Sequence, residues 1–182
     1  DVNRPSYTEC PELLTKTSNI VVFDHHRQNS EVINNPILSY IEPYASSACE
    51  MVAEVLQYFN DGVKLNAAES DCIYAGILID TNNFMTKTGV RTFEAAAWLR
   101  RQGADPTEVR RFFQEDRESF SIKTRALADA VFHEDGIMTS ICKTQHADEQ
   151  VICAQVADEH LTVRGVKVSF VAGINSEGRT VI

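Results

Sequence analysis

The sequence predicts an α/β protein in which a mostly parallel sheet flanked by helices is followed by a smaller mixed α/β domain, truncated at both ends. Three observations support this fold class. An apolar run at Ile20–Phe23 has the length and the β-branched content of a short buried strand. Segments with helical periodicity and N-terminal capping signals follow it. After Glu118, helices begin to alternate with strand patterns, so we place a domain boundary between residues 1–118 and 119–182.

Composition limits the classes of function. The chain has 182 residues, of which 43% are hydrophobic, which is enough for one large or two small domains with a real core. It contains no apolar run of about 18 residues that would span a membrane and no signal-peptide pattern at its start. Its five cysteines lack CxxC spacing, which favours reduced thiols in a cytoplasmic setting. The net charge of −9 argues against long nucleic acid as a partner, but it permits a small phosphorylated substrate beside bound cations.

The strand at Ile20–Phe23 ends in a polar cluster, Asp24-His25-His26-Arg27. In open α/β sheets, ligands bind at the carboxyl ends of the strands. A carboxylate beside two imidazoles is costly to bury there unless a metal ion or a phosphate compensates its charge. We therefore predict a metal or phosphate site at this strand end, the alternative being a solvated polar turn. The strand itself is expected to be buried on both faces.

A capping box predicts the next helix. Ser47 is followed three residues later by Glu50, so a helix is expected from Ala48 to Phe59. Ser46 and Ser47 lie at its start, where their hydroxyls and the free amide groups could bind a phosphate oxygen. For Ser47, capping alone is the simpler interpretation.

A second capping box, Asn66 with Glu69, predicts a largely buried helix over Ala67–Ile79 that brings Asp80 to its carboxyl end. The helix dipole disfavours a carboxylate at that end, and a bound cation would remove the penalty. Asp80 is therefore a second candidate ligand. Arg91 follows in sequence and is expected in an exposed loop, with a phosphate contact as the alternative.

The rest of the chain is expected to form further helices and strands. Gly103 should close a helix that starts at Thr92, and the charged stretch 115–118 should lead into the second domain. The expected bounds of the remaining elements are a helix from Thr107 to Gln114, a helix from Ser121 to Phe132, a strand over Gly136–Ile141, a helix from Glu149 to Leu161, a strand from Val166 to Ala172, a turn at 175–178 and a strand from Arg179.

Three motifs resemble, in the same order, those of the DHH phosphoesterase superfamily, which includes RecJ exonucleases, family II pyrophosphatases, nanoRNA phosphatases and cyclic-di-AMP phosphodiesterases. These motifs are Asp1-Val2-Asn3-Arg4-Pro5-Ser6, Asp24-His25-His26 and the segment Gly76–Phe84. The Asn-Arg-Pro-Ser and Ala45-Ser46-Ser47 stretches are most similar to the cyclic-di-AMP phosphodiesterase branch. Residues 154–159 resemble the start of the DHH-associated C-terminal domain. Two further family motifs are expected before Asp1 and after Ile182.

This resemblance implies a phosphodiesterase that binds two metal ions, usually Mn²⁺. A water acidified by both ions would attack the phosphorus as hydroxide and convert cyclic di-AMP to the linear dinucleotide pApA. Because the resemblance places ligands of the other ion outside these residues, the isolated chain is expected to be inactive. The implied site residues are the metal ligands Asp1 (bridging both ions), His25 and Asp80; the catalytic residues Asp24, which orients an imidazole, and His26; and the substrate-binding residues His26, Arg27, Ser46 and Ser47.

Two alternatives remain open. The chain could be another DHH phosphoesterase, such as a pyrophosphatase, a nanoRNA phosphatase or a RecJ-like exonuclease. It could also be a non-catalytic nucleotide-sensing module, although Asp1, His25 and Asp80 would be expensive side chains for such a module to keep. The expected partner is a cyclic dinucleotide, with no long nucleic acid and no membrane contact by this fragment, and a homodimer is left open. The expected location is a cytoplasmic domain of a membrane-anchored parent protein.

Overall fold

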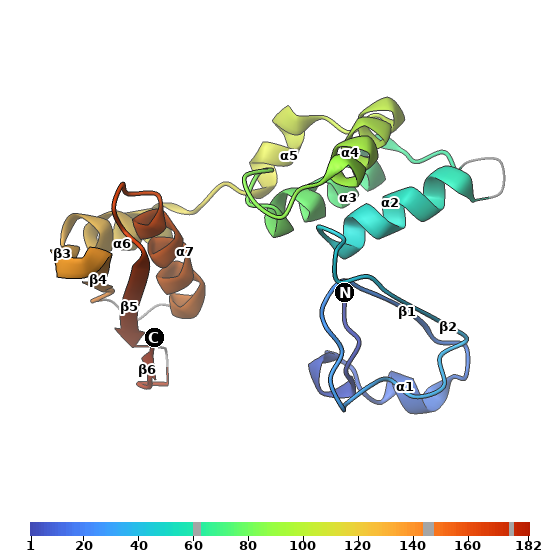
Figure 1. The fold of residues 1–182 in the computed structure, drawn as a ribbon, viewed down its shortest axis with the longest axis horizontal. Helices are drawn as coiled ribbons and strands as arrows, with labels where there is room; N and C mark the ends of the chain where they lie inside the picture. The colour runs from blue at the N-terminus through green and yellow to red at the C-terminus, as the bar shows by residue number, and fades with distance from the viewer. Residues whose placement is uncertain (60–62, 144–147, 175–176) are drawn as a thin grey trace. The chain divides into compact units, whose positions relative to one another are not determined.

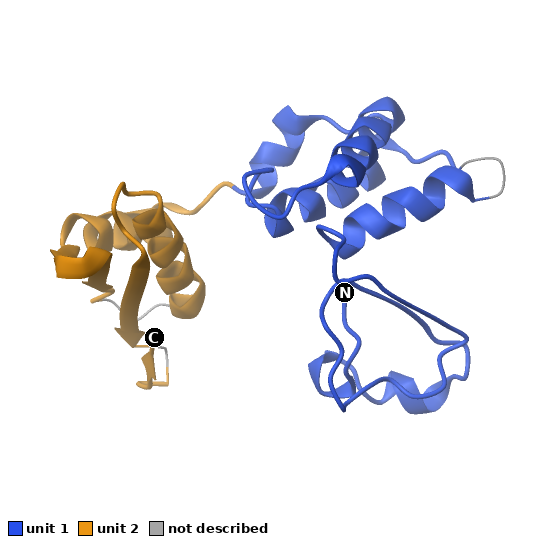
Figure 2. Ribbon diagram, viewed as in Figure 1, with its two compact units in different colours: residues 1–113 blue, residues 114–182 orange. Residues whose placement is uncertain are grey.

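The computed structural model describes residues 1–59, 63–143, 148–174 and 177–182. The chain forms two compact units, residues 1–113 and residues 114–182 (Figure 2). The sequence placed the boundary slightly later, after residue 118. The expected turn at 175–178 lies partly outside the described residues. Across the described part of the chain, no helix is both long and apolar enough to cross a membrane.

The first unit contains a two-stranded parallel sheet (Figure 1). β1, Val21–Asp24, pairs with β2, Leu38–Ile41, in the register that sets Asp24 beside Ile41. Val22 and Asp24 are 5% and 1% exposed, whereas the first residue of the strand, Val21, is 51% exposed. The prediction of a strand buried on both faces is therefore wrong for the described residues, because side chains alternate across a strand and only one face of β1 is covered.

Four helices follow the sheet; the starts of α2 and α3 agree with the capping signals, whereas α4 begins at Val90, two residues before the expected Thr92. α2 spans Ala48–Tyr58, and α3 spans Ala67–Asp80 with the Asn66–Glu69 capping box fully formed. The other helical elements of this unit are η1 (Pro5–Tyr7), α1 (Leu13–Lys16), α4 (Val90–Gln102, closed by Gly103) and α5 (Pro106–Phe112).

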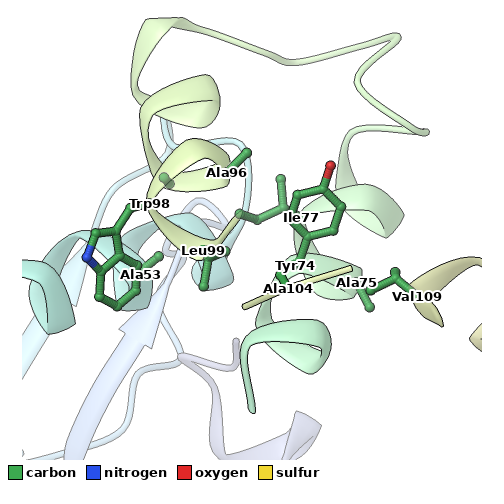
Figure 3. Close-up of a cluster of buried hydrophobic side chains, with 10 residues drawn as sticks. Ala53, Tyr74, Ala75, Ile77, Ala96, Trp98, Leu99, Ala104 and Val109 are labelled. Atoms are coloured by element: carbon green, nitrogen blue, oxygen red, sulfur yellow. The ribbon is translucent and has the colours of Figure 1, made fainter. Parts of the chain in front are cut away.

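The core of this unit lies between α2, α3, α4 and α5 (Figure 3). Ile77, Leu99 and Val109 are fully buried, and Trp98 and Tyr74 close the cluster. A fully buried side chain of this kind stabilises the fold by about 1.5–3 kcal/mol. The cluster packs the last turns of α3 firmly, so the residue that ends α3 has a fixed position.

The second unit begins at a helix cap. The side chain of Asp116 accepts hydrogen bonds from two backbone amides of the first turn, so α6 spans Arg117–Ala128. The predicted helix from Ser121 to Phe132 is therefore wrong at both ends. Val131–His133 forms β3, because these residues pair in antiparallel register with β4, Ile137–Ile141.

The sheet of the second unit has the order β3-β4-β5-β6. β5, Val168–Ile174, is parallel to β4 and antiparallel to β6, Thr180–Val181. α7 spans Glu149–Leu161, as predicted, and packs with α6 on this sheet. The buried apolar residues that join them are Ile122, Ala126, Ile152, Val156 and Val171.

Candidate metal centre

Asp24 organises the turn that follows β1. It is the last residue of the strand and is 1% exposed. Its Oδ1 accepts hydrogen bonds from the backbone amide of His26 at 3.0 Å and pairs with the ring Nδ1 of His26 at 2.7 Å. Burial alone would raise the pKa of Asp24, but these two hydrogen bonds and the charge of the His26 ring outweigh burial and lower the pKa. Asp24 is therefore an ionised anchor that fixes the His26 ring, whose side chain is 59% exposed.

His25 points inward, with only 8% of its side chain exposed. Its Nδ1 lies 3.3 Å from the carbonyl oxygen of Ala45, which can only accept a hydrogen bond, so Nδ1 carries the proton. In the neutral imidazole, Nε2 then carries the lone pair. This buried atom has no hydrogen-bond partner among the described residues. It lies 3.5 Å from Oδ1 of Asp1 and 3.6 Å from Oδ2 of Asp80.

Asp80 is held by an unusual turn at the end of α3. The hydroxyl of Thr81, which is fully buried, donates to the carbonyl oxygen of Ile77 at 2.6 Å and accepts from the backbone amide of Phe84 at 3.0 Å. Asn82, Asn83 and Phe84 have φ values of 45°, 56° and 64°, in the left-handed region. The Phe84 ring stacks on Phe93 with centroids 5.5 Å apart. Three consecutive non-glycine residues in this region are costly, so tertiary packing must hold the turn.

The segment that carries Asp1 is tied to the turn after β1. The side-chain amide of Asn3, which is 3% exposed, donates to the carbonyl oxygen of His26 at 3.3 Å. Arg4 donates to the carbonyl oxygen of Arg27 at 3.2 Å. These contacts place a second carboxylate beside the His25 ring. Sequence reasoning used Asn3 and Arg4 only as part of a motif and missed this anchoring role.

The geometry fits a divalent metal ion. Asp1, His25 and His26 can each offer a ligand atom, and these atoms lie within 4.8 Å of one another. Two ligands about 2.1 Å from one ion are about 3.0–3.4 Å apart at bond angles of 90–110°, close to the 3.5 and 3.6 Å that separate His25 Nε2 from Asp1 and Asp80. Nε2 of His25 faces the carboxylates of Asp1 and Asp80, and a cation bound there would satisfy this buried nitrogen. Asp80 lies outside the group of three residues whose ligand atoms are all within 4.8 Å of one another. His26 is a poorer ligand through Nδ1, because Asp24 already occupies that atom.

The predicted substrate-binding residues occupy different environments. Arg27 and His26 are exposed at the turn. Ser46 and Ser47 are 1% and 0% exposed, and both hydroxyls are engaged inside the turn before α2. A contact between these hydroxyls and a ligand would require the turn to open. A cavity of about 90 Å³ lies beside the site, lined by Asp1, Val2, Asn3, Arg4, Tyr7, Asp24 and His26.

Sequence reasoning missed the environment of Glu50 and Arg91. Ser47 caps α2 as predicted, by accepting from the Glu50 amide at 3.0 Å, but the Glu50 carboxylate bonds to Ser46 and does not complete a capping box. Arg91 is not a loop residue: it lies in the first turn of α4 and pairs with Glu54 through two hydrogen bonds of 2.7 Å. The Ser47-x-x-Glu50 spacing was the available signal for Glu50, and no local signal connects Arg91 to its partner.

The fold and the site together define a class: an α/β domain with carboxylate and imidazole side chains gathered where its parallel strands end. Comparison with known families is more specific. Residues 1–77 match the DHH family, N-terminal domain. This match assigns the first 77 of the 182 residues to the DHH family.

Similar proteins cover more of the chain than the family match does. The chain is 41% identical to the cyclic-di-AMP phosphodiesterase PdeA of Listeria monocytogenes over 94% of its length, and 41% identical to the cyclic-di-AMP phosphodiesterase GdpP of Geobacillus thermodenitrificans over 98%. It spans only about a quarter of those proteins, 26% and 27% respectively. A crystal structure of an exopolyphosphatase-related protein from Bacteroides fragilis matches 97% of this chain and 54% of that chain, with a TM-score of 0.79 and 17% identity, which shows a shared fold.

Proposed function

We propose that this chain is the DHH part of a metal-dependent phosphodiesterase that hydrolyses cyclic di-AMP to pApA. The observation that carries the proposal is the buried Nε2 atom of His25, which lies 3.5 Å from Asp1 Oδ1 and 3.6 Å from Asp80 Oδ2 and has no hydrogen-bond partner among the described residues. The proposed substrate is taken from relatives that are named as cyclic-di-AMP phosphodiesterases and are 41% identical over nearly the whole chain.

Asp1, His25 and Asp80 are proposed to hold Mn²⁺, with Asp1 as the bridge to a second ion in the intact protein. Two carboxylates and one imidazole form a mixed oxygen and nitrogen donor set, which suits Mn²⁺. Bound ions of this kind supply a water of lowered pKa and neutralise charge on the phosphate. The role of the protein is to aim the donors: Ala45 fixes the proton on the far nitrogen of His25, and the turn after α3 fixes Asp80.

The exposed side chains are proposed to contact the phosphodiester. Asp24 holds the His26 ring through Nδ1, and the exposed Nε2 can donate a hydrogen bond to a phosphate oxygen when the ring is protonated at both nitrogens. Arg27 follows it at the same turn and offers a second cationic donor. In hydrolysis, water adds to phosphorus and the bond to the 3′ oxygen breaks, so these donors act where negative charge develops.

The remaining assignments extend the proposal to the intact protein. We assign residues 1–113 to the DHH domain and residues 114–182 to the start of the DHH-associated C-terminal domain, which would contribute to recognition of the dinucleotide. The parent protein is proposed to be membrane-anchored, with this part on the cytoplasmic side, and a homodimer is left to experiment.

The test uses the intact protein with Mn²⁺ and chromatography of the products. We expect cyclic di-AMP to be converted to pApA, while pyrophosphate stays largely intact under the same conditions. Removal of divalent ions with a chelator should stop the reaction, and added Mn²⁺ should restore it. Faster turnover of pyrophosphate than of cyclic di-AMP would replace this proposal with a pyrophosphatase function.

A further inference from the structure

Glu50 is a buried carboxylate close to the metal centre but outside its ligand set. It lies in the first turn of α2 and is 1% exposed. Its Oε2 accepts hydrogen bonds from the hydroxyl of Ser46 and from the Ser46 amide, the latter at 3.4 Å. Its Oε1 faces Arg91, whose Nε is 3.9 Å away. A buried carboxylate is expensive unless donors or a cation compensate it, and here Oε2 accepts two hydrogen bonds while Oε1 faces the charge of Arg91.

The Ser46 amide belongs to the same peptide group as the Ala45 carbonyl. A trans peptide is planar, and its N–H and C=O point in opposite directions. When Glu50 holds the Ser46 N–H at one edge of this planar group, the Ala45 carbonyl points from the opposite edge, where it meets Nδ1 of His25 at 3.3 Å. The carboxylate of Glu50 and the ring of His25 are therefore connected through one rigid peptide group.

We propose that Glu50 is a positioning residue for the metal centre, which fixes the orientation and the tautomer of His25 through the Ala45–Ser46 peptide. The inference rests on the proposed function, since it assumes that His25 Nε2 binds a metal ion. Partners that orient a ligating histidine typically change metal affinity by 10–100-fold when they are mutated. Glu50 touches neither substrate nor metal in this scheme.

Arg91 completes the arrangement by placing a positive charge beside Glu50. The guanidinium bonds to Glu54 through two hydrogen bonds of 2.7 Å and presents its charge to Glu50. Hydrogen bonds to Glu54 raise the pKa of Arg91 despite its partial burial, so Arg91 stays charged at any physiological pH. Glu54 therefore shares the same arginine more tightly than Glu50 does, yet no hydrogen bond links its carboxylate to the Ala45–Ser46 turn among the described residues.

This difference supplies a matched pair of variants. Both Glu50 oxygens accept hydrogen bonds or face a cation, so the amide of Glu50→Gln must direct its NH₂ group toward a donor on one side. Glu54→Gln removes the same charge from the same arginine, without touching the turn. A purely structural role through Arg91 would be affected by both changes, whereas a positioning role is affected only by the first.

The experiment measures Mn²⁺ binding to the intact protein by the loss of the free-ion EPR signal, with thermal unfolding as a check on folding. His25→Ala should abolish Mn²⁺ binding at one site. We expect Glu50→Gln to lower the Mn²⁺ affinity of that site by about 10-fold or more, and Glu54→Gln to change the same affinity by less than about threefold. Glu50→Gln should lower kcat at limiting Mn²⁺ and recover as Mn²⁺ is raised. In a His25→Ala background, Glu50→Gln should have no further effect on Mn²⁺ affinity, because coupled residues are not additive.

Unchanged Mn²⁺ affinity in folded Glu50→Gln, or an equal loss in Glu54→Gln, would overturn the inference. If Glu50→Gln does not fold, Ser46→Ala decides in its place: it removes the hydroxyl donor to Glu50 and should weaken Mn²⁺ binding severalfold, and unchanged affinity would count against the inference. A wild-type protein that binds Mn²⁺ without cleaving cyclic di-AMP would refute the proposed substrate and leave the positioning role to be judged by the binding data alone.

Discussion

Each unit contains one cluster of side chains of the types that bind metal ions, and the two clusters differ in what surrounds them. Asp1, His25 and His26 in the first unit have ligand atoms within 4.8 Å of one another, and Cys142, Glu149 and Cys153 in the second unit meet the same condition. In the first cluster, the side chains of Asp1 and His26 are 46% and 59% exposed. In the second cluster, all three residues are buried.

Protonation separates the two clusters further. Burial, followed by the contact with Cys142 and the charge of Glu149, raises the pKa of Cys153 to about 12. Burial also raises the pKa of Cys142. A thiol must lose its proton to bind a metal ion, so these cysteines act at neutral pH as small packing residues beside the sheet. Short distances between ligand atoms are therefore insufficient for a metal centre: the donors must also be unprotonated and open to an entering ion.

The largest expected effect comes from His25→Ala in the intact protein. Loss of the imidazole should lower kcat for cyclic di-AMP by about 10⁴-fold, equivalent to about 5.5 kcal/mol in the barrier. The thermal midpoint should change little, because His25 lies after a strand end and outside both hydrophobic clusters. His133→Ala is the control, since this exposed histidine bonds only to Thr139 among the described residues and should retain full activity. Retained activity in His25→Ala would show that the first cluster is not the catalytic metal centre, so that it would no longer differ from the second cluster in function.

The second effect concerns thiol reactivity. At pH 8 a thiol with a pKa of about 12 is ionised about a thousandfold less than one with a pKa near 9, so native Cys153 should react with iodoacetamide correspondingly slowly. Because its folded pKa is raised, the stabilising contribution of the protonated thiol is present below pH 9 and is lost as the pH rises toward 12. Mass spectrometry should find rapid labelling of the exposed Cys10 and Cys72, and labelling of Cys142 and Cys153 only in denaturant. Rapid native labelling of Cys153 would show that the second cluster is open.

The third effect tests how tightly the second cluster is packed. An added Cβ at Gly173 would lie 2.3 Å from Glu149 Oε1 and 2.8 Å from Cys153 Sγ. Gly173→Ala should therefore lower the free energy of unfolding by about 2–3 kcal/mol, measured by urea denaturation. Gly89→Ala is the matched control, because nothing lies within 4 Å of its added Cβ and its φ is −133°. Equal stability of the two variants would mean that the second cluster has room for a ligand.

Local signals predicted much of the fold. The starts of α2 and α3 follow from Ser47 and Asn66, whose caps involve residues three positions away, and α7 has the expected bounds. β3 was missed because its strand character depends on pairing with β4, and the charged residues before α6 resembled a linker until Asp116 was seen to cap a helix.

The sequence predicted which residues form the site, but it did not predict the contacts that hold those residues in place. Sequence motifs named Asp1, His25 and Asp80, and the structure places them together, while their role as ligands stays a prediction. The spacing of Ser47 and Glu50 cannot show whether the Glu50 carboxylate accepts from Ser46, as it does, or completes a capping box with Ser47. Arg91 pairs with a residue 37 positions earlier, across two helices, and no local pattern encodes such a contact.

The left-handed turn after α3 has a consequence for the dynamics of the site. Asn82, Asn83 and Phe84 adopt backbone angles that cost about 1 kcal/mol or more each, and the hydroxyl of Thr81 and the ring contacts of Phe84 offset this cost. We expect such a segment to open as a local cooperative unit at a lower free energy than global unfolding. Opening would release the residue that precedes it, Asp80, from its place beside His25. Amide hydrogen exchange at Phe84 should therefore report how often the site comes apart, and an ion held by Asp80 should slow that exchange by mass action.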